Sequence, residues 1–203
     1  MTNDTYKTIA KTSSGIYKEK GSKFLAFAYP VTSEDEFKEY LNQLKKDYHD
    51  ARHYCYAFKL GLSENEYRYS DDGEPNNSAG APIFGQIQSF ELTNIVIIVV
   101  RYFGGTKLGV GGLVTAYKEA AKEALSNAQI IKKTVDNYYE IIFGYEIMSD
   151  VMNFIKQHQL EIIKQTLEEK ATIQFKVRKS EADSIIEQFN LIIKINLSLI
   201  KTI

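Results

Sequence analysis

Residues 94–112 read NIVIIVVRYFGGTKLGVGG, a run of β-branched residues that leads directly into a glycine-rich segment. The first part, Asn94 to Tyr102, has the composition of a buried strand. Small side chains allow a helix to pack closely on a sheet, and small and apolar residues recur at helical spacing after the glycines. These residues are Leu113, Ala116, Tyr117, Ala120, Ala121 and Ala124. The stretch therefore predicts a strand, a glycine-rich junction and a helix, in that order.

The sequence before this stretch predicts further elements of the same domain. Alternation around Gly15 to Glu19 and again from Lys23 to Tyr29 predicts a hairpin with a turn at Lys20-Gly21-Ser22. Ser33 precedes Glu36 at the spacing of a capping box, and the apolar residues behind it recur at the helical period. The remaining elements expected here are strands at His53 to Leu60 and Glu66 to Ser70 and a loop at Asp71 to Ala81.

The sequence after residue 134 has a different composition, since only Gly144 of the 12 glycines lies beyond Gly112. The element order there is β-α-β-β-α-β, which is typical of a ferredoxin-like domain. Ser180 and Asp183 have capping-box spacing before the second helix. The expected elements are strand Asn137 to Tyr145, helix Ser149 to His158, strands Glu161 to Leu167 and Ala171 to Arg178, helix Ser180 to Phe189, and a strand around Ile192 to Ile200.

We therefore expect an α+β protein of two domains. Residues 1–134 are predicted to form a β-α domain with a mixed sheet, and residues 135–203 a ferredoxin-like domain. The polar stretch around residues 132–137 is the expected boundary.

The glycine-rich junction from Phe103 to Gly112 is the first candidate site. A loop between a buried strand and a helix exposes backbone N–H groups at the positive end of the helix dipole, where an anion binds well. The sequence matches neither the phosphate-binding loop with its lysine and hydroxyl residue nor the dinucleotide fingerprint. The alternative is a sharp turn that serves packing alone. The candidate residues are Gly104, Gly105, Lys107, Gly109, Gly111 and Gly112.

An acidic loop provides the second group of candidates. Its carboxylates, Asp71, Asp72 and Glu74, are candidates for ligand contact or proton transfer, or they belong to a solvated turn. Arg101 ends the buried strand and either neutralises an anion or forms an ion pair with this loop. Two further candidates are Ser78, which lies within the loop, and His53, which lies near the start of a strand. Together the glycine loop and the acidic loop are expected to line one binding cleft for an anion or a partner. The alternative is that the two loops only hold each other.

Composition excludes several classes of function. Lys and Arg number 25 against 26 for Asp and Glu, so no bulk positive charge indicates nonspecific nucleic-acid binding. Because Cys55 is the single cysteine, an internal disulfide and a multi-cysteine metal site are excluded. Cys55 is expected to fill the core. We expect no metal, no cofactor, no membrane span and a cytoplasmic location.

Three motifs together resemble the Impact family in its bacterial YigZ-like form. They are His53-x-x-x-Ala57, the segment from Asp71 to Gly80, and the segment from Val100 to Leu113. Ser78 stands where threonine is usual in the family and keeps the hydroxyl group. The resemblance spans roughly residues 15–130, and the remainder of the chain resembles the small second domain of bacterial members.

The resemblance implies a first domain like the second domain of a small-subunit ribosomal protein and a second domain like the last domain of elongation factor G. It implies a nonenzymatic regulatory factor in translation that binds a ribosomal or other protein partner, or structured RNA. The alternative is an enzyme or sensor for a small anionic, phosphorylated metabolite held by the glycine loop. No peptidase machinery or nucleophile motif is present in the sequence.

Overall fold

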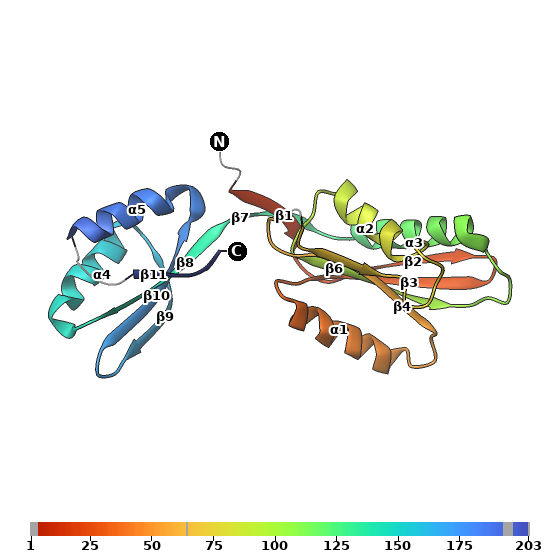
Figure 1. Ribbon diagram of the computed structural model, residues 1–203, viewed down its shortest axis with the longest axis horizontal. Helices are drawn as coiled ribbons and strands as arrows, with labels where there is room; N and C mark the ends of the chain where they lie inside the picture. Colours follow the sequence, from red (N-terminus) through yellow and green to blue (C-terminus); the bar gives the residue numbers. More distant parts are fainter. Residues whose placement is uncertain (1–3, 64, 193–196, 203) are drawn as a thin grey trace. The chain divides into compact units, whose positions relative to one another are not determined.

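The computed structural model describes residues 4–63, 65–192 and 197–202 of the chain. It divides into two compact units (Figure 1). The larger unit is Tyr6–Lys133, and the smaller unit joins Thr134–Ile203 to the N-terminal segment Met1–Thr5. Two short strands, β1 (Thr5–Ile9) and β7 (Ile130–Thr134), pair in a two-stranded sheet to which the sequence pattern gave no pointer.

A five-stranded sheet forms the centre of the larger unit. Its strands lie in the order β2-β3-β6-β4-β5, and all neighbouring strands are antiparallel. The expectation of a mixed sheet was wrong, because β6 lies between β3 and β4, the two strands that run in the same direction. The strand bounds are β2 Ser13–Glu19, β3 Ser22–Pro30, β4 His53–Lys59, β5 Tyr67–Ser70 and β6 Ile95–Tyr102.

Helices cover both faces of this sheet (Figure 1). Helix α1 (Glu34–Asp47) packs on one face over residues such as Val96 and Ile98. Helices α2 (Gly80–Ser89) and α3 (Gly109–Ser126) pack on the other face. Because successive residues of a strand point to opposite faces, β6 is apolar on both sides and buried along its length. The predicted strand, glycine junction and helix are confirmed.

The starts of α1 and α2 show how far local signals in the sequence reach. The Ser33 hydroxyl accepts a hydrogen bond from the backbone N–H of Glu36, so the predicted cap of α1 is confirmed. Helix α2 (Gly80–Ser89) begins inside the segment expected to be a loop. Its Pro82 lies in the first turn, where the helix needs no N–H donor.

The smaller unit has the ferredoxin-like topology. Its strands lie in the order β11-β8-β10-β9 with antiparallel neighbours, as the predicted β-α-β-β-α-β order requires. Helix α5 begins at Lys179, so Ser180 lies inside the helix and the expected cap was wrong. The expected last strand began near Ile192, but residues 193–196 lie outside the described residues and β11 begins at Leu197. The bounds are β8 Asp136–Phe143, η1 Tyr145–Ile147, α4 Met148–Gln157, β9 Glu161–Leu167, β10 Ala171–Arg178, α5 Lys179–Ile192 and β11 Leu197–Thr202.

The core of the smaller unit lies between its sheet and its two helices. Phe175 and Phe189 are fully buried there, with Phe154 edge-on to Phe189. Among the described residues, no helix combines the length and the apolar character needed to cross a membrane.

Candidate functional site

The glycine loop is fixed to the tip of the β2–β3 hairpin. Lys20 and Gly21 adopt positive φ angles of 46° and 80° in the turn. The N–H of Gly104 donates a hydrogen bond to the buried hydroxyl of Ser22 at 3.1 Å. A Cβ atom at Gly104 would lie 1.9 Å from the backbone carbon of Gly21, so only glycine allows this approach. The contact positions the loop, and with it Phe103, beside the hairpin.

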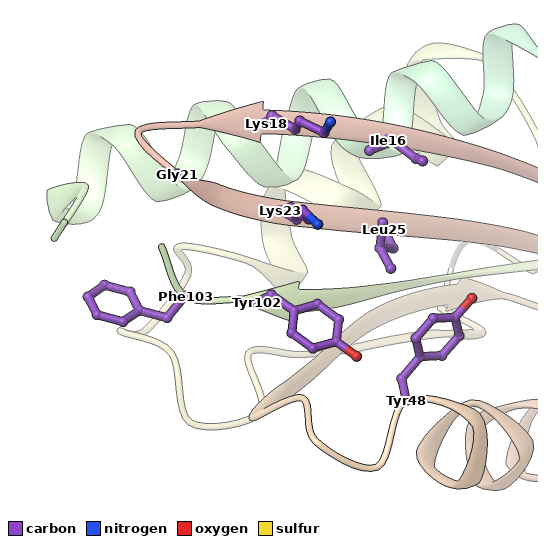
Figure 2. Close-up of a pocket in the computed structure, with 8 residues that line it drawn as sticks. All are labelled: Ile16, Lys18, Gly21, Lys23, Leu25, Tyr48, Tyr102 and Phe103. Atoms are coloured by element: carbon purple, nitrogen blue, oxygen red, sulfur yellow. The ribbon is translucent and has the colours of Figure 1, made fainter. Parts of the chain in front are cut away.

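A cavity of 460 Å³ lies next to this contact (Figure 2). Its lining comes from β2, β3, the end of β6 and the residue that ends α1, and it lies on the sheet face that α1 partly covers. We call this cavity the hairpin groove. It is lined by Ile16, Lys18, Gly21, Lys23, Leu25, Tyr48, Tyr102 and Phe103.

Two lysines and a tyrosine form a row across the groove. The strand register pairs Lys18 with Lys23, and Lys23 with Tyr102, so the three side chains stand side by side on neighbouring strands (Figure 2). In the part of the chain that the structure describes, neither ammonium group has a carboxylate within ion-pair distance. The row therefore presents two unneutralised positive charges beside an aromatic ring.

The rest of the groove is apolar and aromatic. Ile16 and Leu25 are paired across the hairpin one step further from the turn, and Ile16 is 59% exposed. Phe103 is 53% exposed at the end of the groove. The hydroxyl of Tyr102 donates a hydrogen bond to Asp50 at 2.6 Å, and this bond, together with burial, raises the pKa of Tyr102 to about 12. Tyr102 is thus a neutral, oriented ring.

The acidic loop uses its carboxylates within the fold. Asp71 accepts hydrogen bonds from the N–H groups of Asn77, Ala79 and Gly80 at 2.8–2.9 Å, which caps the start of α2. Asp72 accepts a hydrogen bond from the N–H of Tyr54 at 2.6 Å. The backbone carbonyl oxygen of Asp72 lies 2.8 Å from Nδ1 of His53.

Glu74 is held in a buried network below this loop. Its carboxylate forms an ion pair with Arg101 and accepts a hydrogen bond from the Tyr117 hydroxyl at 2.8 Å. The Cys55 sulfur lies 3.0 Å from Asp71 O and 3.3 Å from the Tyr117 hydroxyl, and its single S–H donates to one of these oxygens at a time. Burial raises the pKa of the Cys55 thiol and of the Tyr117 hydroxyl far above their usual ranges. Both shifts favour the protonated thiol and the protonated phenol at neutral pH.

The predicted site residues thus fall into two groups. The first group joins the acidic loop to β4 and β6 through hydrogen bonds and an ion pair, with the Ser78 hydroxyl donating to Pro75 O within the loop; its other members are His53, Asp71, Asp72, Glu74 and Arg101. The second group is the glycine loop, of which Gly104 contacts the hairpin, whereas Gly105, Lys107, Gly109 and Gly111 are exposed and Gly112 packs beside Leu108.

Phe103 opens the predicted glycine-rich junction, but the two lysines and the two tyrosines of the hairpin groove were not among the predicted site residues. A signal for part of them exists in the sequence, because a turn at residues 20–22 places Lys18 opposite Lys23. The contributions of Tyr48 and Tyr102 depend on the way that α1 and β6 pack beside the hairpin. Among the described residues, no group of three or more histidine, cysteine, aspartate or glutamate side chains could hold a metal ion.

Comparison with known proteins places this geometry in a family. A crystal structure described as that of a hypothetical protein has the same fold, with a TM-score of 0.75 and 24% identity over 97% of this chain and 96% of that one. YigZ of Escherichia coli is 31% identical over 146 residues, which is 71% of this chain and 72% of YigZ. YvyE of Bacillus subtilis is 28% identical over 155 residues, or 76% of this chain and 71% of YvyE. Both relatives are named as IMPACT family members. The Impact N-terminal domain matches residues 20–125, and the chain belongs to the Impact family.

Proposed function

We propose that this protein is a translation-associated regulatory factor that binds RNA through the hairpin groove. The link to translation rests on its membership of the Impact family. It also rests on what the resemblance of the sequence motifs implies, namely domains like those of a ribosomal protein and of elongation factor G. The observation that carries RNA binding is the row of Lys18, Lys23 and Tyr102 beside the exposed ring of Phe103. Cations for phosphates and rings for bases are the combination that RNA-binding surfaces use.

The charge of the groove is local, which agrees with the composition of the chain. The net charge is −1, so the protein lacks a general positive field and must attract RNA with a few well-placed lysines. In contrast, the charges of Arg101 and Glu74 neutralise each other in the buried network. These two residues support the interpretation that the acidic loop and β6 hold each other, and the groove is the better candidate for the RNA contact.

Cosedimentation with ribosomal particles over a salt series tests this proposal. We expect association at low salt, a steep loss as salt rises, and a much weaker association of the double variant Lys18→Ala/Lys23→Ala. The matched control is Lys118→Ala/Lys122→Ala, which removes two exposed lysines of α3 on the opposite face and changes the net charge equally.

Three outcomes would contradict the proposal. The first is absence of association at every salt concentration. The second is association with purified ribosomal proteins but not with ribosomal RNA, which would assign the groove to a protein partner. The third is equal weakening by both double variants, because it would leave only the total charge as the cause.

A second candidate is a small phosphorylated metabolite at the start of α3. Its support is that α3 begins at Gly109 with no side-chain cap and no acidic residue in its first turn. A Cβ atom at Gly109 or Gly111 would meet nothing within 4 Å, and Lys107 is exposed nearby in the sequence. Thermal-shift measurements with nucleotides and sugar phosphates test it: a ligand of this site raises the Tm of the wild type but not of Lys107→Ala. An unchanged Tm with every compound removes this candidate.

A further inference from the structure

We infer that the hairpin groove takes a single-stranded segment of RNA, with one phosphate between Lys18 and Lys23 and one base stacked on Phe103. This inference rests on the proposed RNA-binding function and specifies the form of RNA that the groove recognises. Figure 2 shows the two lysines on neighbouring strands and Phe103 at the end of the groove near the Gly21 turn.

The lysine pair is the first argument. Lys18 and Lys23 are directly opposite residues of an antiparallel pair, and like charges in that arrangement destabilise the hairpin. Glu19, the acidic residue next to Lys18, accepts a hydrogen bond from Tyr17 on the face that α3 covers. An anion bound between the two ammonium groups relieves their repulsion. A phosphate, which offers several acceptor oxygens, suits two point charges of this kind.

The ring of Phe103 is the second argument. The Arg101 guanidinium lies 5.7 Å from the centroid of this ring and 5.5 Å from the centroid of Phe24, so a buried cation supports Phe103 from the protein side. More than half of the residue is nevertheless exposed, at 53%. Because Gly104 fixes the adjacent backbone to the hairpin, the ring is a positioned platform and not part of a freely moving loop.

These two features together favour a single strand over a duplex. The bases of a duplex are stacked on each other, so their faces are closed to a side chain, whereas an unpaired base can stack on a protein ring. The apolar floor of Ile16 and Leu25 gives the sugar and base edge a surface to cover. An acidic peptide would neutralise the lysines equally well, but it would leave the platform of Phe103 and the adjacent Tyr102 unused.

Fluorescence anisotropy with the full chain tests the inference. The probe is a labelled, unstructured RNA of about 12 nucleotides, in the range of single-strand site sizes. The competitors are the same RNA annealed to its complement and a poly-glutamate peptide of the same length. We expect the single strand to bind at least about tenfold more tightly than the duplex, because only its bases can leave the stack.

Variants separate stacking from charge. Phe103→Leu keeps an apolar side chain but loses the ring, and it should weaken single-strand binding at least about fivefold. Phe103→Tyr keeps the ring and should bind like the wild type. Lys18→Ala/Lys23→Ala should reduce the slope of log K against log salt by about 0.7, from the loss of the one phosphate contact that the two lysines share. Lys118→Ala/Lys122→Ala should leave that slope unchanged.

The outcomes distinguish this inference from the proposed function. Equal competition by the duplex, or an unchanged affinity of Phe103→Leu, overturns the single-strand inference, and in that case a lysine-dependent association with ribosomal particles would still support RNA binding. Stronger competition by poly-glutamate than by RNA assigns the groove to an acidic peptide and overturns the inference. Failure of the protein to bind any RNA at low salt overturns both.

Discussion

The guanidinium of Arg101 and the carboxylate of Glu74 lie 2.5 Å apart, from Nη1 to Oε1, with 8% and 4% of their side chains exposed. The pair joins the end of the central strand β6 to the acidic loop, 27 residues earlier in the sequence. Tyr117 of α3 donates a hydrogen bond to the same carboxylate oxygen. Three segments of the larger unit therefore depend on one buried charge pair.

Removal of the negative charge from this pair should be costly. Glu74→Gln leaves the Arg101 charge buried without its partner, which costs about 3–5 kcal/mol in comparable cases, and Nε of Arg101 already has no hydrogen-bond partner among the described residues. We expect a correspondingly large fall in the free energy of unfolding, measured by urea denaturation. The control is Glu91→Gln, since Glu91 pairs with Lys7 on the surface and should cost less than about 1 kcal/mol. Similar losses for both variants would show that the buried pair has no special role.

The ion pair between Asp4 and Arg178 in the smaller unit should make stability depend on pH in the acidic range. Arg178 donates two hydrogen bonds to Asp4, at 2.6 and 3.1 Å, and together with Ser180 it lowers the pKa of Asp4 to about 2. Because the pKa is lower in the folded state, the stabilisation is present above the unfolded value near 4 and is lost as the pH falls toward 2.

Asp4→Asn tests this dependence. The variant should be less stable than the wild type at pH 7, and the difference in Tm should shrink as the pH falls from about 4 to about 2. Asp35→Asn is a control, because Asp35 pairs with Lys38 on an exposed helix surface and the exposed pair contributes little. A difference between wild type and Asp4→Asn that stays constant down to pH 2 would mean that the ion pair does not stabilise the fold.

Local patterns in the sequence predicted the elements that local forces form. The Ser33 cap, the alternation of β2 and β3 and the β-branched run of β6 are each specified within a few residues, and all were confirmed. Helix α2 was not predicted, because Pro82 and Gly85 interrupt its helical pattern and its cap, Asp71, lies nine residues before its first residue. Its start depends on a loop contact that periodicity does not show.

The candidate site was harder to predict than the fold. The glycine loop was recognised, and its contact with Gly21 is the reason why glycine is needed at position 104. The hairpin groove could not be assembled from the sequence, since Lys23 faces Tyr102 only because β6 pairs with β3. Arg101 and Glu74 also became a pair only through that packing, although an ion pair between them was one of the alternatives.

Reagents for thiols should leave Cys55 unmodified in the folded protein. The residue is fully buried, and burial raises its pKa far above the usual thiol range, so almost no thiolate exists at pH 8. We expect no reaction with an aromatic disulfide reagent under native conditions and one reacting group per chain in denaturant. Because Cys55 is the single cysteine, the unfolded chain is its own control. Rapid reaction of the native protein would contradict the buried position.

Two glycines of the same loop-to-helix segment should respond oppositely to alanine. A methyl group at Gly104 would collide with the backbone of Gly21 and Ser22, so Gly104→Ala must displace the loop from the hairpin and lower the free energy of unfolding, by about 1–3 kcal/mol for overpacking of this kind. At Gly111 the methyl group meets nothing within 4 Å. The residue lies in the first turn of α3, and its φ angle is outside the positive range. Gly111→Ala should therefore stabilise the protein by about 0.4–1 kcal/mol. Urea denaturation measures the free energy of unfolding of both variants.

Since Gly104 also positions Phe103, Gly104→Ala should weaken RNA binding as well, whereas Gly111→Ala should not. A Gly104→Ala protein of unchanged stability would mean that the loop and the hairpin are not in contact.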